Sequence, residues 1–160
     1  MPFSPRFSAA DAQVLERDAV YEGFFSLEKL RLKHRLFGGG WSQPLSREMF
    51  NRGDAVAVLP WDPIRDELIL VEQFRPGALR AQENPWMLEL VAGMVADGET
   101  DSDVAKREAL EEAGCTLDQL RLIATFYPSA GACSEQMRAF VGRVVSAGVG
   151  EIHGLADEHE

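Results

Sequence analysis

Hydrophobic and polar side chains alternate with a period of two between Phe25 and Leu36. Leucines and His34 fall on one side of this segment, and lysines and arginines fall on the other, which is the pattern of a half-buried β-strand. Because His34 shares the apolar side, we expect it to be a hydrogen-bonded core residue rather than a ligand. The glycines at 38–40 are expected to turn the chain into a second strand.

Later apolar runs predict more strands and one helix. Residues 55–60 and 67–74 flank the sequence WDPIRD, whose Asp-Pro pair favours a turn, so these two runs predict a hairpin. A helix is predicted over 101–113, because Thr100 can cap its first amide groups and Gly114 stands just past its end. Asp101 or Ser102 could replace Thr100 as the cap. Further strands are predicted, in chain order, at 86–93, 120–127 and 137–145. The whole pattern is that of an α+β protein.

Three glutamates of this helix, Glu108, Glu111 and Glu112, fall within about one third of its circumference. Most of the other side is apolar: Ala105, Ala109, Leu110 and Ala113. Arg107 precedes Glu111 by four residues and can neutralise part of the cluster. Carboxylates this close repel one another unless their pKa values rise, solvent separates them or a divalent cation binds. Oxygen ligands of this kind suit Mg²⁺ or Mn²⁺, although acidic stretches on helices are more often solvated faces.

A longer pattern of residues at set spacing, which includes the helix, favours the interpretation that the three carboxylates bind a cation. It fits G-x5-E-x7-R-E-U-x-E-E-x-G-U, in which U is apolar, and a chance match at seven set positions is on the order of 10⁻⁹ per start point. The matching residues are Gly93, Glu99, Arg107, Glu108, Glu111, Glu112 and Gly114, with Ala109 and Cys115 at the U positions. The pattern resembles the Nudix box. The resemblance implies an α/β/α sandwich around a mixed sheet, in which the box forms a loop–helix–loop.

The same resemblance implies roles for the residues of the box. Mg²⁺, with Mn²⁺ as an alternative, would be held by the carbonyl of Ala92 and the carboxylates of Glu108, Glu111 and Glu112. Glu99 and Arg107 would orient these ligands. Arg107, through this orientation, and Glu112, as a metal ligand, would both serve catalysis. A surface ion pair between Arg107 and Glu111 is an equally open interpretation.

Beyond the box, segments from Arg17 onward resemble the ADP-ribose pyrophosphatase branch of the family, among them LVEQFRP, PWMLELVAGMVADGE and IHGLADEHE. In that branch the N-terminal strands pack across a two-fold partner, so the resemblance implies a homodimer. Residues 1–52 would form an N-terminal β region for dimer and substrate contacts, and residues 53–160 the catalytic domain. The matching substrate-binding residues are Phe24, Arg47, Glu48, Arg75, Met94 and Ser129.

Two of these residues carry the clearest implied contacts. Phe24 would stack on adenine and Arg75 would bind the diphosphate, a role that suits a rigid bidentate donor. The alternatives are a buried Phe24 and surface ion pairs for Arg47 and Arg75.

The C-terminal segment 148–160 is expected to be a loop. Its GLADE sequence puts Glu158 where this branch has its general base, with Glu160 as an additional metal contact. A frayed acidic terminus is the alternative. Family members continue into a closing strand and a helix, so we expect the catalytic domain to be C-terminally incomplete here.

The implied reaction is Mg²⁺-dependent hydrolysis of ADP-ribose to AMP and ribose 5-phosphate. One departure leaves the substrate open, because the branch has a proline about fifteen residues beyond the box, where this chain has Ala130. Another nucleoside diphosphate sugar, such as GDP-mannose, is therefore an alternative substrate. A non-catalytic nucleotide-binding module is an alternative of another class.

Charge and composition limit the classes of molecule that the protein is expected to bind. The net charge of −10 argues against a nucleic-acid or anionic-membrane surface, although metal ions can still bridge an acidic protein to an anionic substrate. No apolar run approaches the length of a membrane span, and Cys115 and Cys133 fit no disulfide framework. We therefore expect a cytoplasmic protein that acts on a nucleoside diphosphate sugar and binds neither nucleic acid nor membrane.

Overall fold

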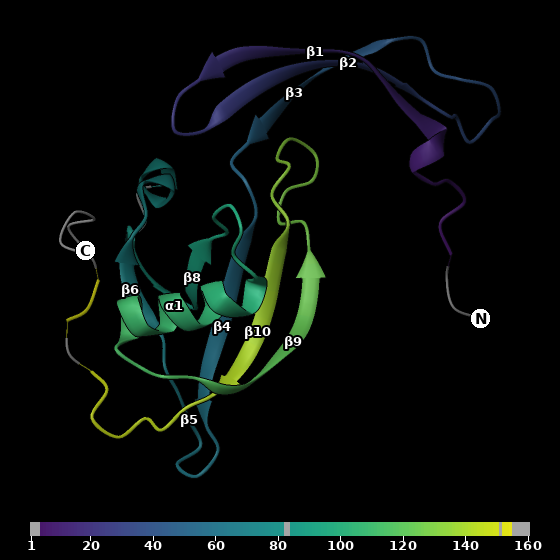
Figure 1. Ribbon diagram of the computed structural model, residues 1–160. Coiled ribbons are helices and arrows are strands. Elements are labelled where there is room, and N and C mark those ends of the chain that lie inside the picture. The colour runs from purple at the N-terminus through teal and green to yellow at the C-terminus, as the bar shows by residue number, and fades with distance from the viewer. Residues whose placement is uncertain (1–3, 82–83, 151, 155–160) are drawn as a thin grey trace. The chain divides into compact units, whose positions relative to one another are not determined.

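The computed structural model describes residues 4–81, 84–150 and 152–154, and the chain divides into two compact units. The first unit consists of Met1–Gly53 and Pro128–Glu135, and the second of Asp54–Tyr127 and Gln136–Glu160. Figure 1 shows the strands of the first unit and the strands and helix of the second.

The first unit is built on a three-stranded antiparallel sheet in the order β1-β2-β3. Its strands are β1 (Ala12–Glu22), β2 (Ser26–His34) and β3 (Leu45–Asn51). The alternating segment of the sequence forms β2, and the chain turns after it into β3, as predicted. Strand β1 was not predicted, because two register shifts interrupt its pairing with β2 and its side chains are exposed on both faces, so no period of two marks it.

The environment of His34 differs from the sequence prediction. His34 is exposed, so it is not a core residue. Its Nδ1 lies 2.9 Å from the carbonyl oxygen of Arg35, and its backbone N–H donates to Ser42 Oγ at 3.1 Å. On the apolar side of β2, only Leu30 in the middle of the strand is buried.

The second unit is built on a mixed five-stranded sheet. Its main path runs β5-β4-β10-β9, and β8 also pairs with β4. The parallel pair β4–β10 lies at its centre, and the other pairs are antiparallel. The strands are β4 (Ala55–Asp62), β5 (Glu67–Leu68), β8 (Val91–Met94), β9 (Asp118–Phe126) and β10 (Met137–Arg143). Central position explains why β4 begins with four consecutive buried residues.

Two predicted strands are each divided in the structure. Residues 67–74 form β5, which pairs with β4, and β6 (Val71–Phe74), which pairs with β7 (Trp86–Glu89). The β4–β5 ladder ends where Ile69 N–H donates to the Pro60 carbonyl at 3.1 Å, because a proline has no N–H to donate in return. Residues 86–93 likewise form β7 and then β8, in two different sheets.

The helix α1 (Asp101–Ala113) has the predicted bounds. Thr100 caps it by accepting from the N–H of Asp103, and Gly114 follows in the left-handed conformation with φ of 58°. The buried side of α1 consists of small residues that let it approach β4 and β8 closely: Val104, Ala105, Ala109 and Ala113. Leu110, which was predicted on the packed side, is exposed, whereas Val104 is fully buried on that side. Figure 1 shows α1 lying across the sheet.

The chain beyond β10 returns to the end of α1. Val149 packs against the core, and the N–H of Gly154 donates to the carbonyl of Glu111 at 3.0 Å. The imidazole of His153 lies over Gly114, where a Cβ would overlap it. Within the described ranges, no helix is long and apolar enough to cross a bilayer.

Candidate active site

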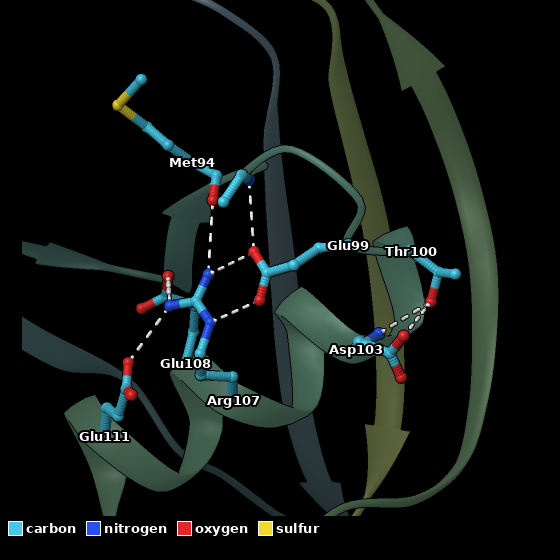
Figure 2. Close-up of polar contacts among 8 residues, drawn as sticks. Met94, Glu99, Thr100, Asp103, Arg107, Glu108 and Glu111 are labelled. Carbon is cyan, nitrogen blue, oxygen red and sulfur yellow. Dashed lines mark hydrogen bonds and ion pairs between the residues drawn. The ribbon is translucent and has the colours of Figure 1, made fainter.

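Arg107, in the middle of helix α1, is the centre of a cluster of ion pairs (Figure 2). Its Nε and Nη2 donate to the two carboxylate oxygens of Glu99 at 2.9 and 3.0 Å. Its Nη1 donates to Glu108 at 2.6 Å and to Glu111 at 3.2 Å, and its Nη2 also reaches the Met94 carbonyl at 3.4 Å. These partners, with the Glu99 hydrogen bond as the largest cause, raise the pKa of Arg107 further above its usual range. Arg107 therefore stays charged and fixes three carboxylates around itself.

Glu99 connects this cluster to the loop before the helix. The hydrogen bond from Arg107 is the main reason that the pKa of Glu99 lies below its usual value, and the N–H of Ala96 contributes to the same effect. That N–H donates to Glu99 Oε2 at 3.2 Å. The loop between β8 and α1 is thus closed on itself and tied to Arg107 on the helix.

Glu108 lies directly against strand β8. A Cβ built on Gly93 would overlap the carboxyl group of Glu108, so only glycine leaves room for the carboxylate at this position. The Glu108 side chain is only 12% exposed. The spacing between Gly93 and Glu108 in the sequence pattern therefore corresponds to a close approach in space.

Glu112 is held by two hydrogen bonds from residues outside the Arg107 cluster. Gln73 Nε2 donates to Glu112 Oε1 at 2.8 Å, and the N–H of Ala92 donates to Glu112 Oε2 at 3.1 Å. Desolvation is the main cause that raises the pKa of Glu112, and the nearby charge of Glu108 adds to it. The two hydrogen bonds and the charge of Arg75 act in the other direction.

Arg75 and Gln73 extend the network into the β6–β7 sheet. Arg75 Nε donates to Glu89 at 3.0 Å, and its Nη2 donates to Gln73 Oε1 at 2.6 Å. Gln73 is only 7% exposed. Sequence reasoning missed Gln73, although a signal was present: it takes an inward position in the alternation Ile69, Val71, Gln73, and a buried amide needs partners.

Glu112 also lines a cavity of about 420 Å³. The cavity lies between the start of β6, the end of α1 and the segment after β10. Its walls are Ile69–Gln73, Glu112, Ala113, Val149, Gly150 and Ile152–Gly154. Glu112 is therefore both partly buried and in contact with a cavity.

The chemistry of these donors fits a divalent cation. In residues 4–81, 84–150 and 152–154, no group of three His, Cys, Asp or Glu side chains is already arranged to hold one, and Glu108 and Glu111 are ion-paired with Arg107. Yet the charge of Glu108 acts unfavourably on the desolvated Glu112, and a cation between them would relieve this repulsion. The predicted contributors Glu158 and Glu160 lie outside the described residues.

Of the predicted substrate residues, Arg75 and Met94 belong to the second unit, and the others belong to the first. Phe24 is 86% exposed, so it is not a core residue. Its ring packs edge-on against that of Phe25, with the two ring centroids 4.7 Å apart. Phe25 in turn contacts Phe50 at 5.3 Å. Phe24 therefore presents an accessible aromatic face.

Arg47, Glu48 and Ser129 also lie in the first unit. Arg47 Nη1 donates to the carbonyl of Ser46 at 2.8 Å. The backbone of Glu48 in β3 lies opposite that of Lys29 in β2. Ser129 begins a tight loop by accepting from the N–H groups of Ala132 and Cys133. This loop is fastened to the end of β3 through Phe50 and Asn51.

Comparison with known proteins identifies the class. A model of the NUDIX domain matches residues 51–160. The chain belongs to the NUDIX domain family, and it is a hydrolase of that family. The predicted α+β fold, with a mixed sheet and the box as a loop–helix–loop, is confirmed.

Individual relatives narrow the class further. The chain is 46% identical over 154 residues to the ADP-ribose pyrophosphatase of Escherichia coli (strain K12), covering 96% of this chain and 74% of the relative. It is 45% identical over 157 residues to that of Haemophilus influenzae, covering 96% and 72%. A GDP-mannose pyrophosphatase of Pectobacterium atrosepticum is 27% identical over 128 residues, covering 79% and 65%. The crystal structure of an ADP compounds hydrolase shares the fold, with a TM-score of 0.65 at 20% identity over 93% of this chain and 73% of that chain. The resemblance to the ADP-ribose pyrophosphatase branch is thereby confirmed.

Proposed function

We propose that this protein hydrolyses the diphosphate of ADP-ribose to AMP and ribose 5-phosphate with Mg²⁺ as its metal, Mn²⁺ being able to replace it. The observation that carries the proposal is the position of Glu112. Its carboxylate lines a cavity, lies near the charge of Glu108 and is joined through Gln73 to Arg75. A carboxylate that can bind a cation thus lies near a guanidinium that is held in place. Recognition of a diphosphate requires both groups.

The residues that would hold the metal are the box glutamates and one carbonyl. They are Ala92 through its backbone oxygen and Glu108, Glu111, Glu112 and Glu160 through their carboxylates. When bound, the metal would neutralise phosphate oxygens and lower the pKa of a water molecule.

The protein's own groups complete the proposed reaction. Arg75 is held by Glu89 and Gln73, and it would bind the diphosphate and stabilise the charge that develops on the leaving phosphate. Glu158 would accept the proton of the attacking water as a general base. Arg107 keeps Glu108 and Glu111 in place from the side of Glu99.

Substrate recognition would also involve residues of the N-terminal region, which a partner subunit would supply. The exposed ring of Phe24 suits stacking on adenine. Arg47 and Glu48 would contribute from β3, and Met94 and Ser129 would line the ribose. We propose that the protein acts as a cytoplasmic homodimer in which a partner subunit supplies the N-terminal residues, with residues 1–52 forming that contribution and residues 53–160 the catalytic domain.

The experiment that tests this function is a comparison of substrates. Purified protein with Mg²⁺ is given ADP-ribose or GDP-mannose at equal concentration, and the products are separated by chromatography. We expect AMP and ribose 5-phosphate from ADP-ribose, at a kcat/KM well above that for GDP-mannose. Faster hydrolysis of GDP-mannose would favour the alternative that Ala130 suggests, and hydrolysis of neither would contradict the proposed function.

A further inference from the structure

Gln73 joins two groups that the proposed reaction uses. It lies in β6 and is only 7% exposed. Its Oε1 accepts from Arg75 Nη2 at 2.6 Å, and its Nε2 donates to Glu112 Oε1 at 2.8 Å. One side-chain amide therefore contacts both the guanidinium and the carboxylate.

The chemistry of the partners fixes the orientation of this amide. A guanidinium can only donate hydrogen bonds and an ionised carboxylate can only accept them, so the oxygen must face Arg75 and the nitrogen must face Glu112. A carboxylate at position 73 could not donate to Glu112, and an apolar side chain could serve neither partner. Gln is thus suited to hold both groups from one buried position.

Each partner is fixed on its other side by a different element. Arg75 Nε is bound by Glu89 of β7, and Glu112 Oε2 is bound by the backbone N–H of Ala92 in β8. Gln73 adds to each of these contacts a hydrogen bond from one shared side chain. The planar amide of Gln73 therefore links the position of the guanidinium to that of the carboxylate.

We propose that Gln73 is a positioning residue that couples the diphosphate-binding Arg75 to the metal-binding Glu112. This inference rests on the proposed function. It implies that the loss of Gln73 weakens metal binding through Glu112 and substrate binding through Arg75 together.

The first test measures metal binding without turnover. Mn²⁺ is titrated into the protein by calorimetry, and the Gln73→Met variant is compared with wild type, since Met has a similar length and makes neither hydrogen bond. Removal of groups that orient metal ligands typically lowers metal affinity by about 10- to 100-fold, and we expect a loss in this range. Gln136→Met is the matched control, because the Gln136 amide binds Tyr127 outside this network.

The second test separates positioning from a purely structural role. At saturating metal, we expect Gln73→Met to raise KM for ADP-ribose by about tenfold. In the Arg75→Ala background, the same substitution should change KM much less, because coupled residues are not additive. A Gln73→Met protein with a lowered melting temperature but wild-type Mn²⁺ affinity and KM would overturn the proposal.

A measurement on the wild-type protein keeps the proposal testable even if the variant does not fold. In ¹⁵N NMR spectra, the Gln73 side-chain NH₂ signals should exchange slowly with solvent and shift when Mg²⁺ is added. Fast exchange and no shift, in a protein that does bind Mg²⁺, would contradict the proposal. Failure of wild type to hydrolyse ADP-ribose counts against the proposed function instead, so the two failures are distinguishable.

Discussion

The carboxyl group of Glu108 occupies the space above Gly93 that any other residue would fill with its Cβ. These two residues are fifteen positions apart in the sequence, yet the helix and strand β8 bring them into direct contact. The glycine of the box pattern and the glutamate that follows its arginine are therefore one structural feature, and it fixes where the carboxylates of α1 meet the sheet.

Gly93→Ala is expected to reduce activity far more than stability. The added methyl group must displace the Glu108 carboxyl, which is the end of a flexible side chain, so the fold can adapt while the proposed metal ligand moves. A displacement of about 1 Å at a reacting centre can cost about 100-fold in rate. The measurement is kcat/KM for ADP-ribose together with the melting temperature. Gly38→Ala is the control, because a Cβ there meets nothing within 4 Å; equal activity in the two variants would contradict the role given to this contact.

Arg107→Met is expected to lower kcat by about tenfold, because Glu99, Glu108 and Glu111 all lose the cation that orients them. The neighbouring Lys106→Met removes the same charge from an exposed position of the same helix and serves as the control. Steady-state rates at saturating Mg²⁺ decide the matter. If both variants lose the same activity, Arg107 acts only through net charge and the positioning role is wrong.

Asp62→Asn is expected to destabilise the protein in a pH-dependent way. The carboxylate of Asp62 accepts from the backbone N–H and the hydroxyl of Ser146 at 2.9 and 3.0 Å, and from the N–H groups of Ile64 and Arg65. These bonds, with that of the Ser146 N–H as the largest cause, lower the pKa of Asp62 to about 2. An unfolded aspartate has a pKa of about 3.9, so the stabilisation is present above that pH and is lost as pH falls towards 2.

Thermal unfolding at several pH values checks this prediction. At pH 7 the variant should melt at a lower temperature than wild type, and the difference should shrink as pH falls from about 4 towards 2. Asp18→Asn, at an exposed position of β1, is the control and should show little change. A melting difference for Asp62→Asn that is constant across this pH range would show that the Asp62 charge is not responsible.

The helix and its ends could be predicted from the sequence because their causes are local. The cap of Thr100, the left-handed Gly114 and the spacing of Glu108, Glu111 and Glu112 all depend on residues within a few positions of one another. The resemblance to the box added a long-range expectation, that Ala92 lies near the helix glutamates, and in the structure the N–H of Ala92 donates to Glu112 at 3.1 Å.

The strand boundaries could not be predicted in the same way, because pairing partners lie far apart in the sequence. The apolar run 67–74 gives no sign that its two halves pair with different strands, and neither does 86–93. The exposure of His34 also depends on what covers the sheet rather than on β2 itself. Gln73 was missed for a related reason. Its role depends on its hydrogen bond to Glu112, which lies far away in the sequence on the helix, as well as on its hydrogen bond with the nearby Arg75.

The most direct test of the account is the rate of Mg²⁺-dependent hydrolysis of ADP-ribose by Glu112→Gln, with Glu22→Gln at an exposed position as control. The substitution keeps the size of the side chain and removes the charge that lines the cavity beside Glu108. We predict a loss of kcat of at least about 100-fold in Glu112→Gln and wild-type activity in the control. A Glu112→Gln enzyme that keeps most of its Mg²⁺-dependent turnover would contradict the proposed site.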